Sequence, residues 1–321
     1  MRPVVGVLRG GPSSEYEISL LSGASVLAEL PKDKYEARDL FVDREGTWHS
    51  RGVPVSPEKA LAGVDAVFNV IHGEYGEDGT LHRVFDPLGV PYTGPSQFDS
   101  TRAFNKQHTK DALREHGVRS PYSVVVEPGS AYEAVAQDVF RLVTLPMIIK
   151  PVIGGSSVGM SIVRSFHELE NALRHAAQVS PKILVEEFIT GREATVGVVD
   201  NFRGAEHYAL MPVEIIPPPG RFFDYEVKYN GQTKELVPST FSDKIKKELE
   251  RVATLVHDKL GMRHYSRSDF IVSPRGVYFL EINNAPAVGM TSESLMPKAL
   301  AAGGTSLGEF LDHVVQLMIR K

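Results

Sequence analysis

The chain has 321 residues, enough for two or three domains with hydrophobic cores of their own. Its net charge of −5 argues against nucleic-acid binding through a general attraction for phosphates. The absence of cysteine excludes disulfides, zinc fingers, iron–sulfur clusters and a cysteine nucleophile. No apolar run approaches the roughly 20 residues that a membrane-spanning helix needs. We therefore expect a cytoplasmic protein without a nucleic-acid or membrane partner.

The first segment alternates strands and helices. The expected strands are residues 4–8, 35–42 and 64–70. A helix should follow the turn at residues 10–14, because Ser14 and Glu17 have the spacing of a capping box. Strand, helix, strand is the order typical of a parallel sheet with crossover helices. The proline- and glycine-containing stretch 91–95 interrupts this pattern and predicts the first domain boundary.

The second segment should begin with a helix over residues 100–116, closed by Gly117. Its other elements are an expected helix at 166–177 and expected strands at 118–126, 145–151, 159–163 and 183–189.

In the third segment, a polar and aromatic loop is expected at 221–237. Ser306 and Glu309 predict a capping box for the last helix. The expected strands are 193–199, 209–216, 267–273 and 277–283, and the expected helices cover 245–260 and 307–318.

An acidic hairpin is the most informative part of the third segment. The sequence from Ser273 to Val277 fits a three-residue hairpin loop with Gly276 in a left-handed conformation. If Ser273 pairs with Val277, counting outward places Asp269 opposite Glu281. The same register places Arg267 opposite Asn283, on the same face of the hairpin.

Two opposed carboxylates repel each other, so a bound cation would stabilise this hairpin. Asp269, Glu281 and Asn283 offer only oxygen ligands, which suit Mg²⁺ or Mn²⁺ better than zinc. The alternative is an acidic face in contact with water.

Three glycine-containing loops are candidates for ligand contacts. Residues 154–159 lie between two expected strands and follow Lys150, so they could hold phosphate; the alternative is an ordinary hairpin. Residues 10–15 follow the first strand, but they lack the third glycine of a dinucleotide-binding motif. In the loop 72–79, His72 is expected on the ligand side, whereas Glu77 and Asp78 are expected to cap the next helix.

Six strings of residues occur in one order along the chain: 10–20, 72–79, 91–94, 150–151 with 155–159, 224–229 and 281–283. Together they resemble the D-alanine–D-alanine ligase family of the ATP-grasp superfamily. The resemblance implies a mixed α/β and α+β chain, an ATP-grasp fold with an N-terminal parallel-sheet (pre-ATP-grasp) domain. The implied parts are an N-terminal substrate-binding domain (1–97), a central ATP-grasp subdomain (98–190) and a C-terminal subdomain with the metal site (191–321).

The implied reaction joins two D-alanines for peptidoglycan precursor synthesis. ATP phosphorylates the first carboxylate, and the amine of the second D-alanine attacks the acyl phosphate. The resemblance also implies two Mg²⁺ or Mn²⁺ ions and a homodimer.

The resemblance assigns roles to individual residues. The residues that would bind ATP are Lys106, Lys150, Ser156, Glu186, Glu187, Ile189, Glu193 and Lys228. The metal ligands would be Asp269, Glu281 and Asn283. The substrate-binding residues would be Glu15, His72, Arg267, Gly289 and Ser294. The catalytic set would be Glu15, Ser156, Tyr229, Arg267 and Gly289, with Tyr229 on a loop that closes over the site. The pair Lys228 and Tyr229 is similar to that of the dipeptide-forming members.

Two departures from the family pattern bear on the substrate. The stretch 286–291 carries two extra residues before Gly289, and Gly154 replaces an acidic or polar residue. One alternative is therefore an ATP-grasp ligase that uses another D-amino or D-hydroxy acid as its second substrate. Another alternative is a non-catalytic ATP-binding relative.

Overall fold

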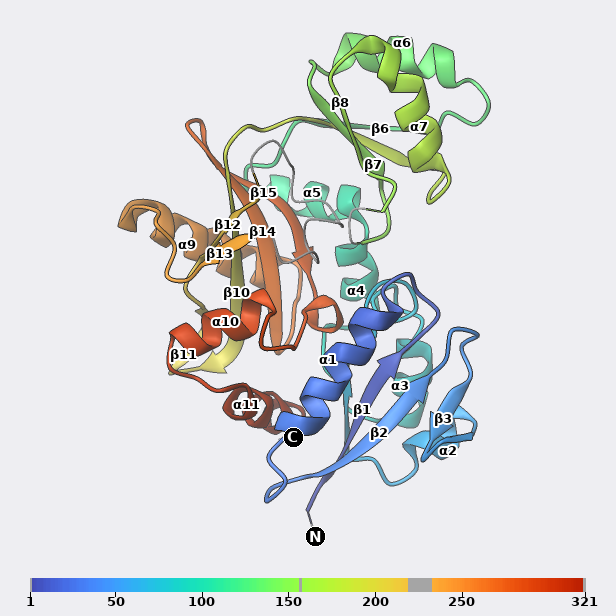
Figure 1. The fold of residues 1–321 in the computed structure, drawn as a ribbon, viewed down its shortest axis with the longest axis vertical. Helices are drawn as coiled ribbons and strands as arrows, with labels where there is room; N and C mark the ends of the chain where they lie inside the picture. The colour runs from blue at the N-terminus through green and yellow to red at the C-terminus, as the bar shows by residue number, and fades with distance from the viewer. Residues whose placement is uncertain (1, 156–157, 219–232, 320–321) are drawn as a thin grey trace.

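In the part of the chain that the structure describes, three β-sheets follow one another along the sequence (Figure 1). The computed structural model describes residues 2–155, 158–218 and 233–319. The middle sheet and its two helices form a lobe of their own, and the first and last sheets lie together in the rest of the molecule (Figure 1).

The first sheet has the strand order β4-β3-β2-β1-β5, and β1 pairs in parallel with both β2 and β5. This confirms the predicted parallel sheet. The short β3 and β4 extend it in antiparallel fashion and were not predicted from the sequence. The strands are β1 (Val4–Gly10), β2 (Glu36–Val42), β3 (Trp48–Ser50), β4 (Val53–Pro54) and β5 (Ala66–Asn69).

The helices of this part are α1 (Tyr16–Glu29), α2 (Pro57–Leu61) and α3 (His82–Leu88). The predicted capping box at the start of α1 is wrong. The N-cap residue is Glu15, which makes no side-chain capping bond. Glu17 instead forms an ion pair of 2.7 Å with Arg44, so it is engaged away from the helix end.

A single helix over 100–116 is also wrong, because the chain forms α4 (Gln97–Phe104) and α5 (Lys106–Arg114). Asn105 separates them, forms an isolated bridge with Ile153 and caps α5 by accepting from the His108 N–H at 3.0 Å. This break places Lys106 at the first position of α5, directly beside the central lobe.

The middle sheet is antiparallel with the order β6-β9-β7-β8. Its strands are β6 (Ser123–Val126), β7 (Met147–Pro151), β8 (Ser161–Val163) and β9 (Ile183–Glu187). Its helices are α6 (Tyr132–Leu142) and α7 (Leu169–Ala177), the latter preceded by the 3-10 turn η1 (Phe166–Glu168). Helix α7 agrees with the predicted helix at 166–177, whereas α6 was not predicted, and each predicted strand of this sheet is too long at one end.

The last sheet has the order β13-β12-β10-β14-β15, with β11 paired to β10. Its strands are β10 (Arg192–Phe202), β11 (Ala205–Ala209), β12 (Val213–Ile216), β13 (Lys234–Leu236), β14 (Tyr265–Ser273) and β15 (Gly276–Asn283). Helix α9 (Asp243–Lys259) packs its apolar face, including Leu249, Val252 and Val256, against this sheet. The predicted loop 221–237 ends in β13, and most of it lies outside the described residues.

The β14–β15 hairpin reaches the predicted pairs by a different route. Ser273 pairs with Gly276 rather than Val277, so the loop has two residues. The register then shifts between Asp269 and Phe270, because Phe270 pairs with Phe279 but Asp269 pairs with Glu281. The extra residue, Leu280, is a bulge that restores the predicted pairs.

The bulge has a packing reason. Two residues apart on a regular strand, Phe279 and Glu281 would point to the same face. With Leu280 between them as a bulge, Phe279 is fully buried, and its ring centroid lies 6.0 Å from that of Phe270. Glu281 faces the opposite side, beside Asp269.

The chain ends in η2 (Ala285–Ala287), α10 (Leu295–Ala302) and α11 (Leu307–Ile319). The predicted capping box of α11 is confirmed. The Glu309 N–H donates to Ser306 Oγ at 3.2 Å, and the Ser306 N–H donates to Glu309 Oε2 at 2.8 Å. Helix α11 is thus capped at its start, and it packs against α1 of the N-terminal part.

The first and last sheets share one hydrophobic core. Phe68 of β5 stacks on Tyr265 of β14, with the ring centroids 6.2 Å apart. The Tyr265 ring also meets that of Phe310 of α11, at a centroid distance of 5.2 Å. Helices α1 and α11 lie side by side over this core (Figure 1). The central lobe instead has a separate core, formed by residues of its own sheet, α6 and α7. The domain boundaries near residues 97 and 190 stay a prediction.

Among the residues that the structure describes, no helix combines the length and the apolar character needed to cross a membrane.

The shared core should dominate stability. Phe310 is 0% exposed, so Phe310→Ala is expected to lower the free energy of unfolding by about 3–5 kcal/mol in chemical denaturation. Phe98 is 71% exposed, and Phe98→Ala should change the free energy of unfolding by less than about 0.5 kcal/mol. Equal losses in the two variants would contradict the assignment of the core.

Candidate active site

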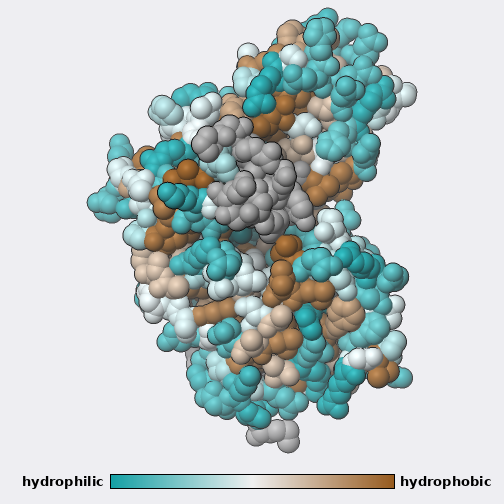
Figure 2. Space-filling model, in the orientation of Figure 1, coloured by the Kyte–Doolittle hydropathy of each residue, from teal (hydrophilic) through white to brown (hydrophobic). Residues whose placement is uncertain are grey.

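Two adjoining pockets lie where the central lobe meets the rest of the molecule. One is lined by residues of β7, β9, β10, β14 and β15, and the other by residues of α1, the loop 72–77, β14, β15 and the segment 284–298. They share Lys106, Gly154, Gly155, Glu281 and Leu295. The second has a volume of about 710 Å³. Figure 2 shows a concave waist at this level of the molecule, with hydrophobic side chains along it.

A buried cluster of charges forms one wall of the first pocket. The Glu186 carboxylate lies between two ammonium groups, with Lys150 Nζ at 2.7 Å and Lys110 Nζ bonded to its other oxygen. Burial alone would raise the pKa of Glu186, but the two lysines outweigh it and lower the pKa to about 2. The carboxylate is therefore charged at neutral pH, and it holds Lys150 in place.

Lys106 connects the two pockets. Its backbone N–H donates to Val152 O at 3.0 Å, and its Nζ donates to Gly154 O at 2.5 Å. Burial lowers its pKa, and the charge of Lys150 contributes to the shift. The start of α5 thereby carries a lysine to the loop that follows β7.

The acidic hairpin forms the opposite wall. Asp269 accepts hydrogen bonds from Thr195 Oγ1 at 2.5 Å, from two Arg267 nitrogens at 3.1 Å and from Asn283 Nδ2 at 3.0 Å. Glu281 pairs with Asp269 across the strands. The side chains of Asp269, Glu281 and Asn283 thus gather on one face of the hairpin, and the donors around Asp269 offset its repulsion from Glu281.

Glu15 is the first acidic group of the second pocket. It is buried at the start of α1, and a Cβ added at Gly73 or Gly155 would lie 3.0 or 3.1 Å from its Oε2. Both loops therefore approach Glu15 closely because they have no side chain there.

Glu77 is the second acidic group, and the expectation that it caps the following helix is wrong. It accepts a hydrogen bond of 2.5 Å from the Gly73 N–H and lines the pocket. Burial, with the nearby Glu15 charge, raises the pKa of Glu77 well above its ordinary value. The same expectation is wrong for Asp78, which accepts from the Thr80 N–H at 2.8 Å in the turn before α3, whereas the N-cap of α3 is Leu81 without a side-chain capping bond.

His72 is fixed by two parts of the chain. Its Nε2 lies 3.2 Å from Ser22 Oγ of α1, and the Met290 N–H donates to the same hydroxyl at 3.3 Å. Burial, together with the Arg267 charge, lowers the pKa of His72 to about 4, so the ring is neutral at pH 7. Ser22 therefore joins the loop after β5 to the backbone beside Gly289.

The two extra residues do not remove Gly289 and Ser294 from the pocket. Both line it, and a Cβ added at Gly289 would lie only 2.6 Å from Ser294 Oγ. Ser294 Oγ also accepts from the Thr291 N–H at 3.2 Å. Only glycine fits at position 289 without moving Ser294, whereas Val288 is accommodated in the core.

The predicted site residues come together in the fold. Every one that the structure describes lines one of the two pockets: Glu15, His72, Lys106, Lys150, Glu186, Glu187, Ile189, Glu193, Arg267, Asp269, Glu281, Asn283, Gly289 and Ser294. Ser156, Lys228 and Tyr229 lie outside the described residues.

Sequence reasoning missed several residues of the site. Lys110 could have been found from its spacing of four from Lys106 on an expected helix, which places both on one face. Ser22 lies seven residues after Glu15 on the same helix, again on one face. Thr195 gave no usable signal, because its role depends on the pairing of β10 with β14.

Comparison with known proteins agrees with this geometry. A family model described as the C-terminus of D-ala D-ala ligase matches residues 114–316, and the corresponding N-terminal model matches 4–59 and 49–95. The D-alanine–D-alanine ligase of Flavobacterium johnsoniae is 33% identical over 98% of this chain and 99% of its own length. The chain belongs to the D-alanine–D-alanine ligase family.

The chain also matches other ligases over most of their length. The D-alanine–D-alanine ligase of Cupriavidus metallidurans is 37% identical over 97% of this chain and 90% of its own. Among solved structures, a D-Ala:D-Ser ligase from Enterococcus faecalis has a TM-score of 0.87 with 29% identity, covering 99% of this chain and 100% of its own. The D-alanine–D-alanine ligase from Coxiella burnetii has a TM-score of 0.84 with 26% identity, covering 99% and 94%. These matches confirm the predicted ATP-grasp fold.

The buried Glu186 predicts a specific pH dependence of stability. An unfolded chain protonates this carboxylate near its ordinary pKa of 4.5, whereas the folded chain does so only near 2. Its contribution to stability is therefore complete above about pH 4.5 and is lost as the pH falls toward 2. Urea unfolding of wild type and Glu186→Gln should show a difference that shrinks through this window.

The exposed Glu133→Gln of α6 is the matched control, because it removes a carboxylate outside the cluster. Its difference from wild type should stay small at every pH. A difference between wild type and Glu186→Gln that is constant from pH 7 to pH 3 would contradict the charge cluster.

Proposed function

We propose that the protein joins two D-alanine molecules into D-alanyl-D-alanine with the consumption of ATP, supplying a precursor of peptidoglycan. The observation that carries the proposal is the meeting of two pockets at Lys106 and Glu281, one lined by buried lysines and the other by carboxylates and a neutral histidine. Membership of the ligase family supports the same reaction.

The proposed reaction has two steps. A carboxylate oxygen of the first D-alanine attacks the γ-phosphorus of ATP, and ADP leaves, which gives an acyl phosphate. The amine of the second D-alanine then attacks the acyl carbon, a C–N bond forms, phosphate leaves and the amine gives up a proton. The protein has to bind both amino acids, keep water out and stabilise the negative charge on the acyl oxygen.

The second pocket supports the substrate roles. Glu15 is assigned to the ammonium group of the first D-alanine, and neutral His72 to its carboxylate. Arg267 and the Gly289 N–H are assigned to the oxygen that becomes negative, which is an oxyanion-hole role. Ser294, in contact with position 289, is assigned to the carboxylate of the second D-alanine.

The first pocket supports the ATP roles. Lys106 and Lys150 are assigned to the phosphates, because buried ammonium groups interact strongly with phosphoryl oxygens. Glu186, Glu187 and Ile189 are assigned to the adenine edge, and Glu193 to the ribose. Roles for Ser156, Lys228 and Tyr229 in closing the site stay predictions, since these residues lie outside the described ones.

The hairpin residues fit a divalent cation. Asp269, Glu281 and Asn283 form an all-oxygen donor set with two directly opposed carboxylates, an arrangement that suits Mg²⁺ or Mn²⁺. When bound, such ions neutralise charge on the transferring phosphoryl group. We assign two ions to this site, and we extend the proposal to a homodimer located in the cytoplasm.

Phosphate release tests the reaction directly. The protein with ATP and Mg²⁺ should release phosphate only when D-alanine is added, and mass spectrometry should detect D-alanyl-D-alanine. The absence of D-alanine-dependent phosphate across a range of pH would rule out the proposal.

Glu281→Gln tests the metal assignment. The substitution keeps the shape of the side chain but removes a charged ligand, so kcat should fall at least about 100-fold. The exposed Glu133→Gln should keep wild-type turnover. Full activity of Glu281→Gln would exclude a metal-binding role for this residue.

A second candidate function differs only in the second substrate. It is favoured by the structural similarity to a D-Ala:D-Ser ligase and by the extra residues next to Gly289. Assays with D-alanine plus an equal amount of D-serine or D-lactate, read by product mass, separate the two. We expect the D-alanyl-D-alanine product to dominate, and a dominant mixed product would favour the second candidate.

A further inference from the structure

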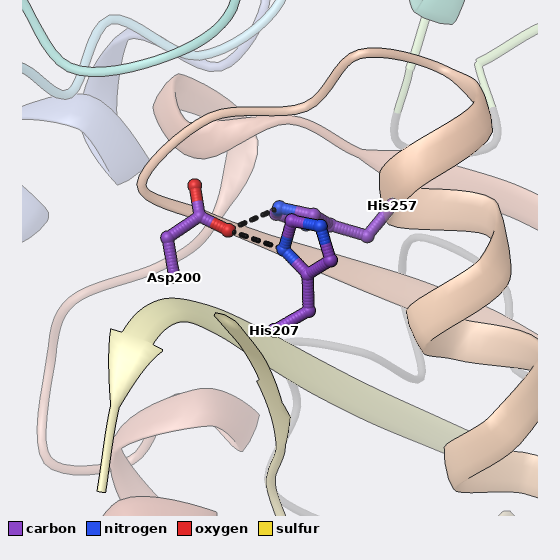
Figure 3. A group of neighbouring side chains, drawn as sticks. All are labelled: Asp200, His207 and His257. Atoms are coloured by element: carbon purple, nitrogen blue, oxygen red, sulfur yellow. Dashed lines mark hydrogen bonds and ion pairs between the residues drawn. The ribbon is translucent and has the colours of Figure 1, made fainter. Parts of the chain in front are cut away.

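A histidine-rich cluster lies outside the two pockets. Asp200 is near the end of β10, His207 is on β11 and His257 is in the last turns of α9. Figure 3 shows both imidazole rings directed at the same carboxylate. His207 Nδ1 lies 2.8 Å and His257 Nε2 lies 2.9 Å from Asp200 Oδ1. None of the three lines a pocket of the proposed active site.

We propose that Asp200, His207 and His257 bind a divalent transition-metal ion of the zinc type. Their three ligand atoms all lie within 4.8 Å of one another. In a tetrahedral site with metal–ligand distances of about 2.0–2.2 Å, neighbouring ligand atoms are about 3.4 Å apart. Small outward movements of the side chains would therefore admit the ion in place of the two hydrogen bonds.

The choice of ion follows from the ligands. Two imidazole nitrogens and one carboxylate oxygen suit Zn²⁺ and its neighbours in the first transition row, whereas Mg²⁺ and Ca²⁺ prefer oxygen ligands alone. The hairpin of the proposed active site has the opposite preference. The two sites should therefore select different metals.

His257 and Asp200 each have an outer hydrogen-bond partner that fixes their orientation. His257 Nδ1 lies 2.8 Å from Ser266 Oγ, and Asp200 Oδ2 accepts from the His264 N–H at 2.6 Å. His207 Nε2 lies 4.0 Å from the Asp258 carboxylate. Metal-binding imidazoles typically use their second nitrogen in this way, and such partners raise the affinity of a site.

The burial of the cluster fits a site with one open position. The side chain of His257 is 0% exposed, whereas those of His207 and Asp200 are 23% and 14% exposed. Water can reach the cluster from the side of His207 and supply a fourth ligand. A bound ion would cross-link the β10–β11 hairpin to α9.

The test uses the full chain stripped of metal and then dialysed against Zn²⁺ with Mg²⁺ in large excess, so that Mg²⁺ competes at the acidic hairpin. Elemental analysis should find one Zn²⁺ per wild-type chain, and Tm should rise by about 4 °C or more. His207→Gln keeps an N–H that can donate to Asp200 but lacks the ring, and it should lose both effects. His167→Gln, an exposed histidine on η1, should behave as wild type.

Cobalt gives a second, spectroscopic readout of the same site. Wild-type protein loaded with Co²⁺ should show the visible absorption of four-coordinate cobalt, and His207→Gln should not. Two results would overturn the proposal. One is wild-type protein without Mg²⁺-resistant Zn²⁺ or without the cobalt absorption. The other is a folded His207→Gln variant that retains the bound equivalent.

Discussion

The carboxylate of Glu186, held between the ammonium groups of Lys110 and Lys150, fixes the positive wall of the cleft. Burying three charges together is costly unless each has a partner, and removing one partner leaves an uncompensated charge. The strand pairing of β7 with β9 sets this arrangement, since Lys150 and Glu186 come from neighbouring strands of the central lobe. Lys150 is therefore held by an ion pair within the protein, which does not require a bound ligand.

The β14–β15 hairpin forms the negative wall of the cleft, where two carboxylates must be held side by side. Asp269 is held by donors from Thr195, Arg267 and Asn283, all from its own sheet. Glu281 is turned toward it by the bulge at Leu280, which leaves Phe279 in the core. The extra residue, Leu280, thus lets β15 direct Phe279 into the core and Glu281 toward Asp269. Lys106 lines both pockets, at the place where they adjoin.

The sequence predicted much of the fold and most of the site, and the misses have physical causes. The alternation of strands and helices predicted the parallel sheet, and the opposed carboxylates predicted the hairpin to which we assign the metal ions. The predicted residue pairs of the hairpin are correct, although the predicted loop length is not. A three-residue loop with a regular ladder and a two-residue loop with a bulge place the same residues opposite each other. Helix 100–116 was split by the bridge between Asn105 and Ile153, a contact between distant segments that local propensity does not contain. Glu77 was misassigned because its burial depends on how the loop folds over Glu15.

The ring contacts of Phe68 with Tyr265 and of Tyr265 with Phe310 have a consequence for dividing the chain. The family models separate an N-terminal region, ending at residue 95, from a C-terminal region that begins at residue 114. The hydrophobic core is not divided there, since the first sheet packs directly on β14 and α11. A fragment cut near residue 97 would expose Phe68, Val70 and the inner face of α1 to water and so invite aggregation. The boundary between the two family models therefore cuts through packing that both regions share, whereas the core of the central lobe consists of that lobe's own residues.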